Sequence, residues 1–228
     1  MKTVTWISAH DAPEWFPPPE QALEDPPGLL AAGGDLSPER LLAAYRRGIF
    51  PWYSPGQPVL WWSPDPRAVL FPGEFRCPRS LAKTLRNGGF STSVDRDFEA
   101  VIDGCAAPRA ASPGTWITPD MRSAYLRLHR LGWAHSIEAW RNGALAGGLY
   151  GVRLGGVFFG ESMFSAVRDA SKVALAHLVA LCLRNSIVVI DCQLYSRHLA
   201  SLGARTIARS QFQRLLREQP AVEPAPLV

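Results

Sequence analysis

The sequence lacks the long hydrophobic run that a membrane helix needs. The longest apolar stretch, residues 173–183, is interrupted by His177 and is shorter than the roughly 18 to 20 apolar residues that span a bilayer. The N-terminus has one basic residue, Lys2, but neither the apolar stretch nor the small-residue cleavage site of a signal peptide. We therefore expect no membrane association and a cytoplasmic location.

Cysteine and histidine are few, and their spacing is not that of ligands. The 4 cysteines form no CxxC pair of the kind that binds zinc and are too sparse for a disulfide scaffold. The 5 histidines show no spacing such as HExxH. We therefore expect reduced thiols, no metal site and no cofactor.

The sequence also has no long run of lysine and arginine, although its net charge is +4. Residues 1–60 hold 4 basic and 7 acidic side chains, which leaves 20 basic and 13 acidic side chains for residues 61–228. A basic larger part is compatible with a polyanionic partner such as nucleic acid, but many basic proteins bind none. Charge alone leaves both possibilities open.

Proline is concentrated at the N-terminus, where residues 1–66 hold 12 of the 20 prolines. This predicts a small, loop-rich domain over residues 1–63, packed against a larger domain over residues 64–228. The clearest element of the small domain is a helix with Ser37 as N-cap, Pro38 as its first residue and Gly48 as its C-terminal stop.

The larger part alternates strand and helix patterns. Helices are expected at 80–86, 97–104, from Thr118 to Gly132, at 170–185, and in two short segments near the C-terminus. Strands are expected at 67–71, 90–94, 135–141, 144–153, 157–164, 187–192 and near Thr206, with an Asn142-Gly143 hairpin turn. This order predicts an α/β fold of the α+β type with a mostly antiparallel mixed sheet, followed by a frayed tail beyond Pro220.

Two polar residues, Asp191 and Gln193, follow the buried strand at 187–190. The period of two in a strand places both side chains on one side. A carboxylate beside an amide at the end of a buried strand is costly unless the polar atoms bind each other, a ligand or the next helix. Two interpretations stay open: Asp191 caps the following helix, or the pair belongs to a functional site.

A second polar group lies at 160–165, where Glu161, Ser162 and Ser165 stand among aromatic residues and Met163. This mixture is typical of a pocket floor, but also of a plain core. The segment nearly matches the GxSxG elbow of serine hydrolases. The closing glycine is missing and no histidine is placed to activate Ser162, which argues against a hydrolase.

Aromatic and basic side chains gather in two further segments. Residues 45–53, together with Trp61 and Trp62, could stack on bases or join the small domain to the large one. Four basic residues at spacings of three and four would share a helix face, which is either solvated or a track for phosphates. They are Arg76, Arg79, Lys83 and Arg86.

Seven motifs in this order resemble the leucyl/phenylalanyl-tRNA-protein transferase family, from about Phe16 to about Leu216. Each motif alone is weak, but their joint presence in register is specific. They are Gly33-Gly34-Asp35-Leu36-Ser37, Gly48-Ile49-Phe50-Pro51-Trp52, Trp61-Trp62-Ser63-Pro64-Asp65-Pro66-Arg67, Gly114-Thr115-Trp116-Ile117-Thr118, Gly160-Glu161-Ser162-Met163-Phe164-Ser165, Asp191-Cys192-Gln193 and Ser201-Leu202-Gly203-Ala204.

The resemblance implies a fold and a reaction. The fold is a small N-terminal domain plus a larger N-acetyltransferase-like domain. The reaction moves leucine or phenylalanine, and less readily methionine, from its tRNA to the α-amine of a protein that begins with arginine or lysine. The product is marked for degradation by the bacterial N-degron route. The implied partners are therefore aminoacyl-tRNA and acceptor proteins, and the expected state is a monomer.

The resemblance also implies roles for particular residues. Asp191 and Gln193 fall on the family's catalytic pair and Glu161 on its active-site carboxylate. The family's aminoacyl pocket falls on Phe158, Met163 and Ser165. Its site for the terminal adenosine falls on Trp52 and Trp116. Its contact with the tRNA 3′ arm falls on Arg76, Arg79, Lys83 and Arg86. One departure is Ile207-Ala208-Arg209, where the family usually has Ile-Pro-Arg.

The implied chemistry needs little activation, because the aminoacyl ester is reactive and an α-amine has a reference pKa near 8. We expect Gln193 to accept a hydrogen bond from the amine, and Asp191 to orient and polarise Gln193. Whether Asp191 or a tRNA hydroxyl takes the proton stays open. Glu161 could pair with the cationic acceptor residue or hold the amine.

Two rival functions remain to be weighed. An acyl-CoA-dependent N-acyltransferase would need a pyrophosphate loop opening a helix, whereas Arg153-Leu154-Gly155-Gly156 continues into a strand. A non-enzymatic RNA-binding module would not depend on Asp191 and Gln193, and a turnover assay with charged tRNA separates it from an enzyme.

Overall fold

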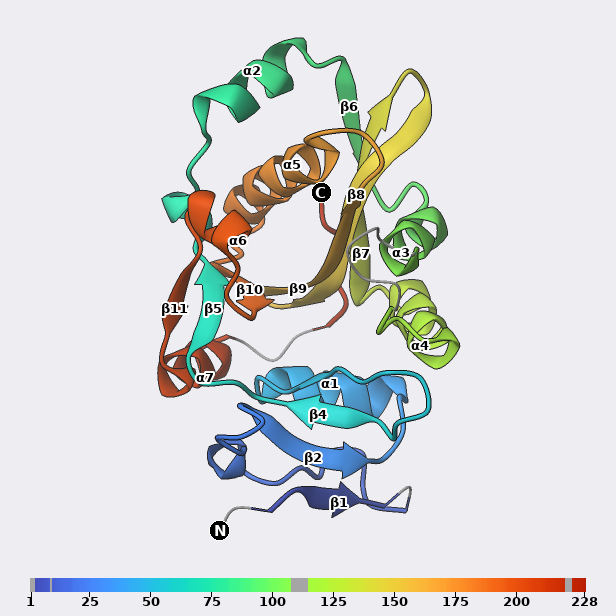
Figure 1. The fold of residues 1–228 in the computed structure, drawn as a ribbon, viewed down its shortest axis with the longest axis vertical. Helices are drawn as coiled ribbons and strands as arrows, with labels where there is room; N and C mark the ends of the chain where they lie inside the picture. The colour runs from blue at the N-terminus through green and yellow to red at the C-terminus, as the bar shows by residue number, and fades with distance from the viewer. Residues whose placement is uncertain (1–2, 9, 108–114, 220–222) are drawn as a thin grey trace.

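The computed structural model of the protein describes residues 3–8, 10–107, 115–219 and 223–228, and it contains two β-sheets (Figure 1). The smaller sheet has the strand order β1-β2-β4-β3, in which β1 runs parallel to β2 and the other neighbours are antiparallel. The sequence analysis missed these strands, because each is at most 5 residues long and they lie among prolines. Their bounds are Thr5–Ile7 (β1), Leu29–Gly33 (β2), Phe50–Pro51 (β3) and Leu60–Trp62 (β4).

Helix α1 (Pro38–Arg46) lies between the small sheet and the rest of the molecule (Figure 1). Ser37 caps it, accepting a 3.4 Å hydrogen bond at Oγ from the backbone N–H of Arg40, and Pro38 is its first residue. Gly48 follows with φ 72°, a left-handed conformation that favours glycine. The predicted helix and both of its end signals are confirmed.

The larger sheet has the order β11-β5-β10-β9-β8-β7-β6. Among the described strands of this sheet, every neighbouring pair is antiparallel except β9 and β10. The predicted α/β fold with a mostly antiparallel mixed sheet is therefore confirmed. The strands are Arg67–Leu70 (β5), Phe90–Val94 (β6), Ala134–Arg141 (β7), Ala144–Leu154 (β8), Val157–Ser165 (β9), Val189–Gln193 (β10) and Arg205–Ile207 (β11).

Helices cover both faces of the larger sheet. Helix α5 packs on one face, and α3 and α4 pack on the other, where they meet α1 (Figure 1). Asp97 and Thr118 cap α3 and α4 with their side chains. The helices are Arg79–Asn87 (α2), Phe98–Ala106 (α3), Pro119–Arg130 (α4), Ala170–Arg184 (α5), Arg197–Ser201 (α6) and Arg209–Arg217 (α7), with short 3₁₀ turns at Pro19–Gln21 and Pro72–Glu74.

The small sheet and one face of the large sheet share a single hydrophobic cluster. Trp61 of β4, Tyr45 of α1 and Phe159 of β9 all belong to it. The chain passes from one sheet to the other between Trp62 and Arg67. A domain boundary between residues 63 and 64 fits this passage and stays a prediction, because the shared cluster joins the two parts.

The geometry of β9 and β10 creates an opening in the large sheet. The two strands pair only from Val189 and Val157 to Asp191 and Phe159, after which β9 continues to Ser165 without β10 beside it. Strand β9 also carries an irregularity against β8, which leaves Glu161 without an opposite residue. Such a bulge reverses the alternation of side chains along the strand.

The C-terminal segment 223–228 is mostly exposed but is anchored at Leu227, so the expected fraying is wrong at this point of the tail. Leu227 is only 1% exposed and belongs to the cluster beneath α5. The guanidinium of Arg153 donates a 2.6 Å hydrogen bond to the carbonyl oxygen of Pro226. Among the residues that the structure describes, no helix combines the length and apolar character needed to cross a membrane.

Candidate active site

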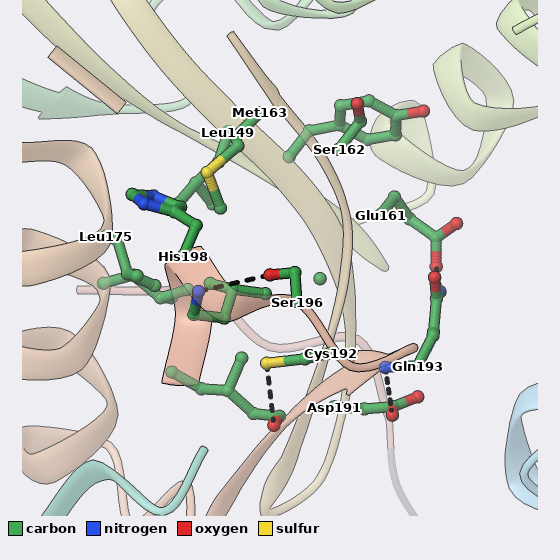
Figure 2. A pocket seen from close by; sticks show the side chains of 15 residues that line it. Leu149, Glu161, Ser162, Met163, Leu175, Asp191, Cys192, Gln193, Ser196 and His198 are labelled. Atoms are coloured by element: carbon green, nitrogen blue, oxygen red, sulfur yellow. Dashed lines mark hydrogen bonds between the residues drawn. The ribbon is translucent and has the colours of Figure 1, made fainter. Parts of the chain in front are cut away.

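A cavity of about 260 Å³ lies where β9 and β10 separate. Figure 2 shows Leu149, Met163 and Leu175 on one side of it, and Glu161 and Gln193 on the other. Figure 2 also shows the imidazole of His198 beside Met163 and Leu149, so this wall is mostly apolar and the opposite wall is polar. A mostly apolar cavity with a few polar groups is the usual form of a small-ligand site. The lining residues are Leu149, Tyr150, Gly160, Glu161, Ser162, Met163, Leu175, Leu178, Ile190, Asp191, Cys192, Gln193, Ser196, His198 and Leu199.

Glu161 stands at the polar wall and is only 8% exposed. Tyr45 of α1 donates a 2.8 Å hydrogen bond to its Oε1, and Tyr125 of α4 donates a 2.7 Å hydrogen bond to its Oε2. The amide nitrogen of Gln193 donates a further 3.1 Å bond to Oε1. Four elements that are far apart in the sequence, α1, α4, β9 and β10, thus meet at one carboxylate.

Burial raises the pKa of Glu161 to about 7, against the lowering effect of the hydrogen bonds from Tyr125 and Tyr45. The charge of nearby Asp191 also raises it, and Arg67 lowers it. Burial and the Glu161 charge raise the pKa of both tyrosines well above its usual value. The phenols therefore remain O–H donors at neutral pH, while Glu161 can both take up and release a proton there.

Gln193 is held in an unusual backbone conformation at the end of β10. Its φ is 62°, and the register of β10 against β5 shifts between Asp191 and Gln193. The regular alternation assumed from the sequence therefore does not hold at this point. The backbone N–H of Gln193 donates a 3.0 Å hydrogen bond to Oδ1 of Asp191, whereas its side-chain amide turns to Glu161.

Asp191 is fully buried and bound by Arg67 at two points. The guanidinium Nε lies 2.8 Å from Oδ1 and its terminal NH2 lies 2.6 Å from Oδ2. The other terminal nitrogen donates a 3.1 Å bond to the carbonyl oxygen of Gly48. The guanidinium carbon also stands 4.8 Å from the ring centroid of Phe50 and 4.9 Å from that of Phe212.

The interpretation of Asp191 as a helix cap is wrong. Helix α6 is capped by Ser196, whose Oγ accepts a 3.2 Å hydrogen bond from the backbone N–H of Leu199. Asp191 instead fixes the backbone of Gln193 and neutralises Arg67.

The three residues predicted for the aminoacyl pocket have separate locations. Met163 lines the apolar wall of the cavity. Phe158 is fully buried in the cluster beneath α5 and is not among the lining residues. Ser165 lies at the end of β9, where its Oγ donates a 2.8 Å bond to Oγ of Ser171, also outside this cavity. The structure thus brings only Met163 to the wall.

Trp52 and Trp116 lie on segments that touch. The hydroxyls of Tyr53 and Thr118, which follow these segments, are 3.1 Å apart. Trp52 is 41% exposed, and its carbonyl oxygen accepts a hydrogen bond from the indole of Trp62. Trp116 is half-buried against the shared cluster. Neither tryptophan lines the cavity. Gly114, which belongs to the same motif as Trp116, lies outside the described residues.

Three of the four predicted tRNA-binding residues, Arg79, Lys83 and Arg86, are exposed along α2. Arg76 precedes the helix, so it does not share the helix face that the spacing suggested. Its backbone N–H donates a 2.9 Å bond to the carbonyl oxygen of Leu202, which ties this segment to the end of α6.

Sequence reasoning missed four polar side chains around the cavity: Arg67, Tyr45, Tyr125 and Tyr150. They appeared only as parts of patterns: Arg67 and Tyr150 within predicted strands, Tyr125 within a predicted helix, and Tyr45 within a predicted helix and the aromatic segment 45–53. The hydroxyl of Tyr150 is buried without a hydrogen-bond partner among the described residues. A tyrosine on the buried face of a helix needs a partner for its hydroxyl, and this signal could have drawn attention to Tyr45 and Tyr125.

The arrangement can hold an apolar group beside a group that exchanges protons. Among the described residues, no cluster of three or more histidine, cysteine, aspartate or glutamate side chains could hold a metal ion. What the cavity offers is an apolar wall, an amide and a carboxylate whose pKa is close to neutral.

Comparison with known proteins identifies the family. A family model described as Leucyl/phenylalanyl-tRNA protein transferase matches residues 69–217, and one described as its N-terminal domain matches residues 34–65. The chain belongs to this family. The transferase is 62% identical to the "Leucyl/phenylalanyl-tRNA--protein transferase" of Chromohalobacter salexigens over 91% of this chain and 80% of that protein. It is 58% identical to the protein of the same name from Methylococcus capsulatus over 97% of this chain and 95% of that protein.

Solved structures show a more distant likeness to the transferase. A GCN5-related N-acetyltransferase from Kribbella flavida matches 75% of this chain and 61% of its own, with a TM-score of 0.42 and 13% identity. The L-PGS of Bacillus licheniformis matches 75% of this chain and 57% of its own, with a TM-score of 0.39 and 10% identity. At such scores the likeness carries no argument about the function of the transferase.

Proposed function

We propose that the transferase moves leucine or phenylalanine, and less readily methionine, from its tRNA to the α-amine of proteins that begin with arginine or lysine. The product would enter the bacterial N-degron route in the cytoplasm, where charged tRNA is made. The observation that carries the proposal is the cavity between β9 and β10, because its apolar wall faces the Gln193 and Glu161 pair. The enzyme would act as a monomer and without a cofactor, since the aminoacyl ester is already activated.

The apolar wall suits the side chain of the transferred amino acid. Leu149, Met163 and Leu175 offer apolar contact to leucine or phenylalanine. The imidazole of His198 stands beside them, but burial lowers its pKa and so disfavours the cation that could pair with a carboxylate. An aspartate side chain would lose its hydration there without compensation. Phe158 would support this wall from the core, and Ser165 would act outside the cavity.

The polar wall suits the attacking amine. The amide nitrogen of Gln193 is engaged by Glu161, which leaves its amide oxygen to accept a hydrogen bond from the amine. Asp191, bound to Arg67, would hold the backbone of Gln193 in place instead of polarising its side chain. The Glu161 carboxylate favours a cationic acceptor over an acidic one.

The tRNA end would extend from this cavity over the surface. Trp52 and Trp116 would hold the terminal adenosine by stacking, which tolerates any base. Arg79, Lys83 and Arg86 on α2, with Arg76 before it, would meet the phosphates of the 3′ arm. This arrangement offers charge and stacking but no code for reading bases, so tRNAs that differ only in the anticodon should serve equally.

The decisive experiment follows radiolabelled leucine from leucyl-tRNA to a peptide that begins with arginine, with an otherwise identical peptide that begins with aspartate as control. We expect transfer to the arginine peptide only, and no transfer from aspartyl-tRNA. Gln193→Ala should lower turnover while binding of charged tRNA changes little. Binding without turnover by the unmodified protein would favour an RNA-binding module instead.

A further inference from the structure

Three oxygen-bearing groups form a closed triangle at the polar wall, the Tyr45–Tyr125–Glu161 triad. The two phenol oxygens are 2.6 Å apart, and each also lies 2.7 to 2.8 Å from one carboxylate oxygen. Each of these three contacts needs a proton of its own, because two oxygens at such a distance repel when no proton lies between them.

The triad has fewer protons than oxygen pairs when Glu161 is ionised. Each phenol supplies one proton and an ionised carboxylate supplies none, so two protons serve three pairs. The amide of Gln193 adds a donor to Oε1 but none between the phenols. One further proton completes the triangle. Because all three side chains are buried, solvent does not satisfy the third pair.

Glu161 lines the cavity in which, on the proposed function, the acceptor amine arrives, and its carboxylate meets the side-chain amide of Gln193 there. We propose that the triad takes up the proton that the acceptor α-ammonium must lose before it attacks the aminoacyl ester. This inference rests on the proposed function and assigns Glu161 as the proton acceptor, with Tyr45 and Tyr125 as positioning residues that hold its carboxylate.

The protons and electrons balance as follows. The ammonium gives one N–H proton to the Glu161 carboxylate, and the nitrogen lone pair so freed attacks the ester carbonyl carbon. The C–N bond forms, the bond between that carbon and the tRNA 3′ oxygen breaks, and the second amine proton ends on the departing 3′ oxygen. The triad later releases its proton to solvent.

The acidity of the groups supports this direction of transfer. An α-ammonium has a reference pKa near 8. The equilibrium constant for moving its proton to a carboxylate with a pKa of about 7 is therefore only about tenfold unfavourable. For a carboxylate with the ordinary glutamate pKa near 4.3, the same equilibrium constant would be unfavourable by a factor of roughly several thousand. A general base with a pKa near the working pH is also the most effective one.

The test is the pH dependence of single-turnover transfer by Glu161→Gln, measured from pH 6 to pH 9 with leucyl-tRNA and a peptide that begins with arginine. We expect the variant to be at least tenfold slower than the unmodified enzyme at pH 7. The deficit should nearly vanish at pH 9, where the amine is neutral without help. A deficit that is the same at every pH would overturn the proposal and leave Glu161 with a binding role.

A second pair of variants tests the proposal independently, in case Glu161→Gln does not fold. Tyr45→Phe and Tyr125→Phe each open the triangle and also remove a donor to the Glu161 carboxylate, so the break in the pH–rate profile should move. Tyr53→Phe loses a hydroxyl bonded to Thr118 instead, and its break should not move. An unmoved break in both triad variants also overturns the proposal. Absence of transfer by the unmodified enzyme would instead contradict the proposed function.

Discussion

Arg67 and Asp191 form a buried ion pair with two parallel contacts, of 2.8 Å and 2.6 Å, in which neither side chain is more than 1% exposed. The pair joins the first strand of the large sheet to the strand that ends at Gln193. Through the carbonyl of Gly48 it also reaches the end of α1. The position of the Gln193 backbone therefore depends on a charge pair that no solvent screens.

Removing one partner of this ion pair should lower the free energy of unfolding far more than replacing both partners with apolar residues. Asp191→Leu or Arg67→Met alone leaves an uncompensated buried charge, which destabilises by about 3–5 kcal/mol. The double variant removes both charges and should recover most of that loss. Urea unfolding of the four proteins measures the coupling, and additive losses in the double variant would contradict the account.

The cavity wall should govern the choice of amino acid. Met163→Ala shrinks the apolar surface that meets a leucine side chain and should lower kcat/KM for leucyl-tRNA by roughly 1–3 kcal/mol, or about 10-fold to 200-fold. Leu183→Ala on α5 alters an apolar side chain that is exposed outside the cavity, and it serves as the matched control. Equal effects of the two variants would place the pocket elsewhere.

The basic side chains of α2 should determine the salt dependence of tRNA binding. Replacing Arg79, Lys83 and Arg86 together by alanine should weaken binding and reduce the slope of log affinity against log salt by roughly one for each phosphate that these side chains neutralise. Arg130→Ala at the end of α4 removes an exposed charge on a different helix. If the slope falls as much in that control, the α2 face is only solvated.

The sequence predicted the elements of the large sheet well, because each has a clear period, cap or turn. Ser37, Asp97 and Thr118 cap the helices that follow them, and Asn142-Gly143 joins β7 to β8 as a hairpin turn. The short strands of the small sheet carry no such signal. Their pairing is decided by contacts between β2 and β4, which lie far apart in the chain.

The site was predicted less completely than the fold. Asp191, Gln193, Glu161 and Met163 do meet at one cavity, as the resemblance implied. The partners of these residues could not be foreseen, because a bulge in β9 and a register shift in β10 decide where their side chains point. Period-two reasoning fails at such irregularities, and these are common next to functional sites.

The stability of the protein should fall as pH rises through the pKa of Glu161. Its pKa is raised from 4.5 to about 7 on folding, so the folded state binds this proton more tightly than the unfolded chain. The contribution of Glu161 is then fully favourable below about pH 4.5 and is lost as pH rises toward and beyond 7. A shift of this size corresponds to about 3 kcal/mol at most, to order of magnitude.

Glu161→Gln isolates this effect, because the amide keeps the shape of the carboxyl group and cannot ionise. The difference in unfolding free energy between the variant and the unmodified protein should therefore move in favour of the variant between pH 5 and pH 8. Urea unfolding at both values measures the difference, and Glu39→Gln, at an exposed position in the first turn of α1, controls for a general loss of charge. A difference that does not change with pH would mean that Glu161 is ionised throughout this range, and the triad would then have no proton to exchange near neutral pH.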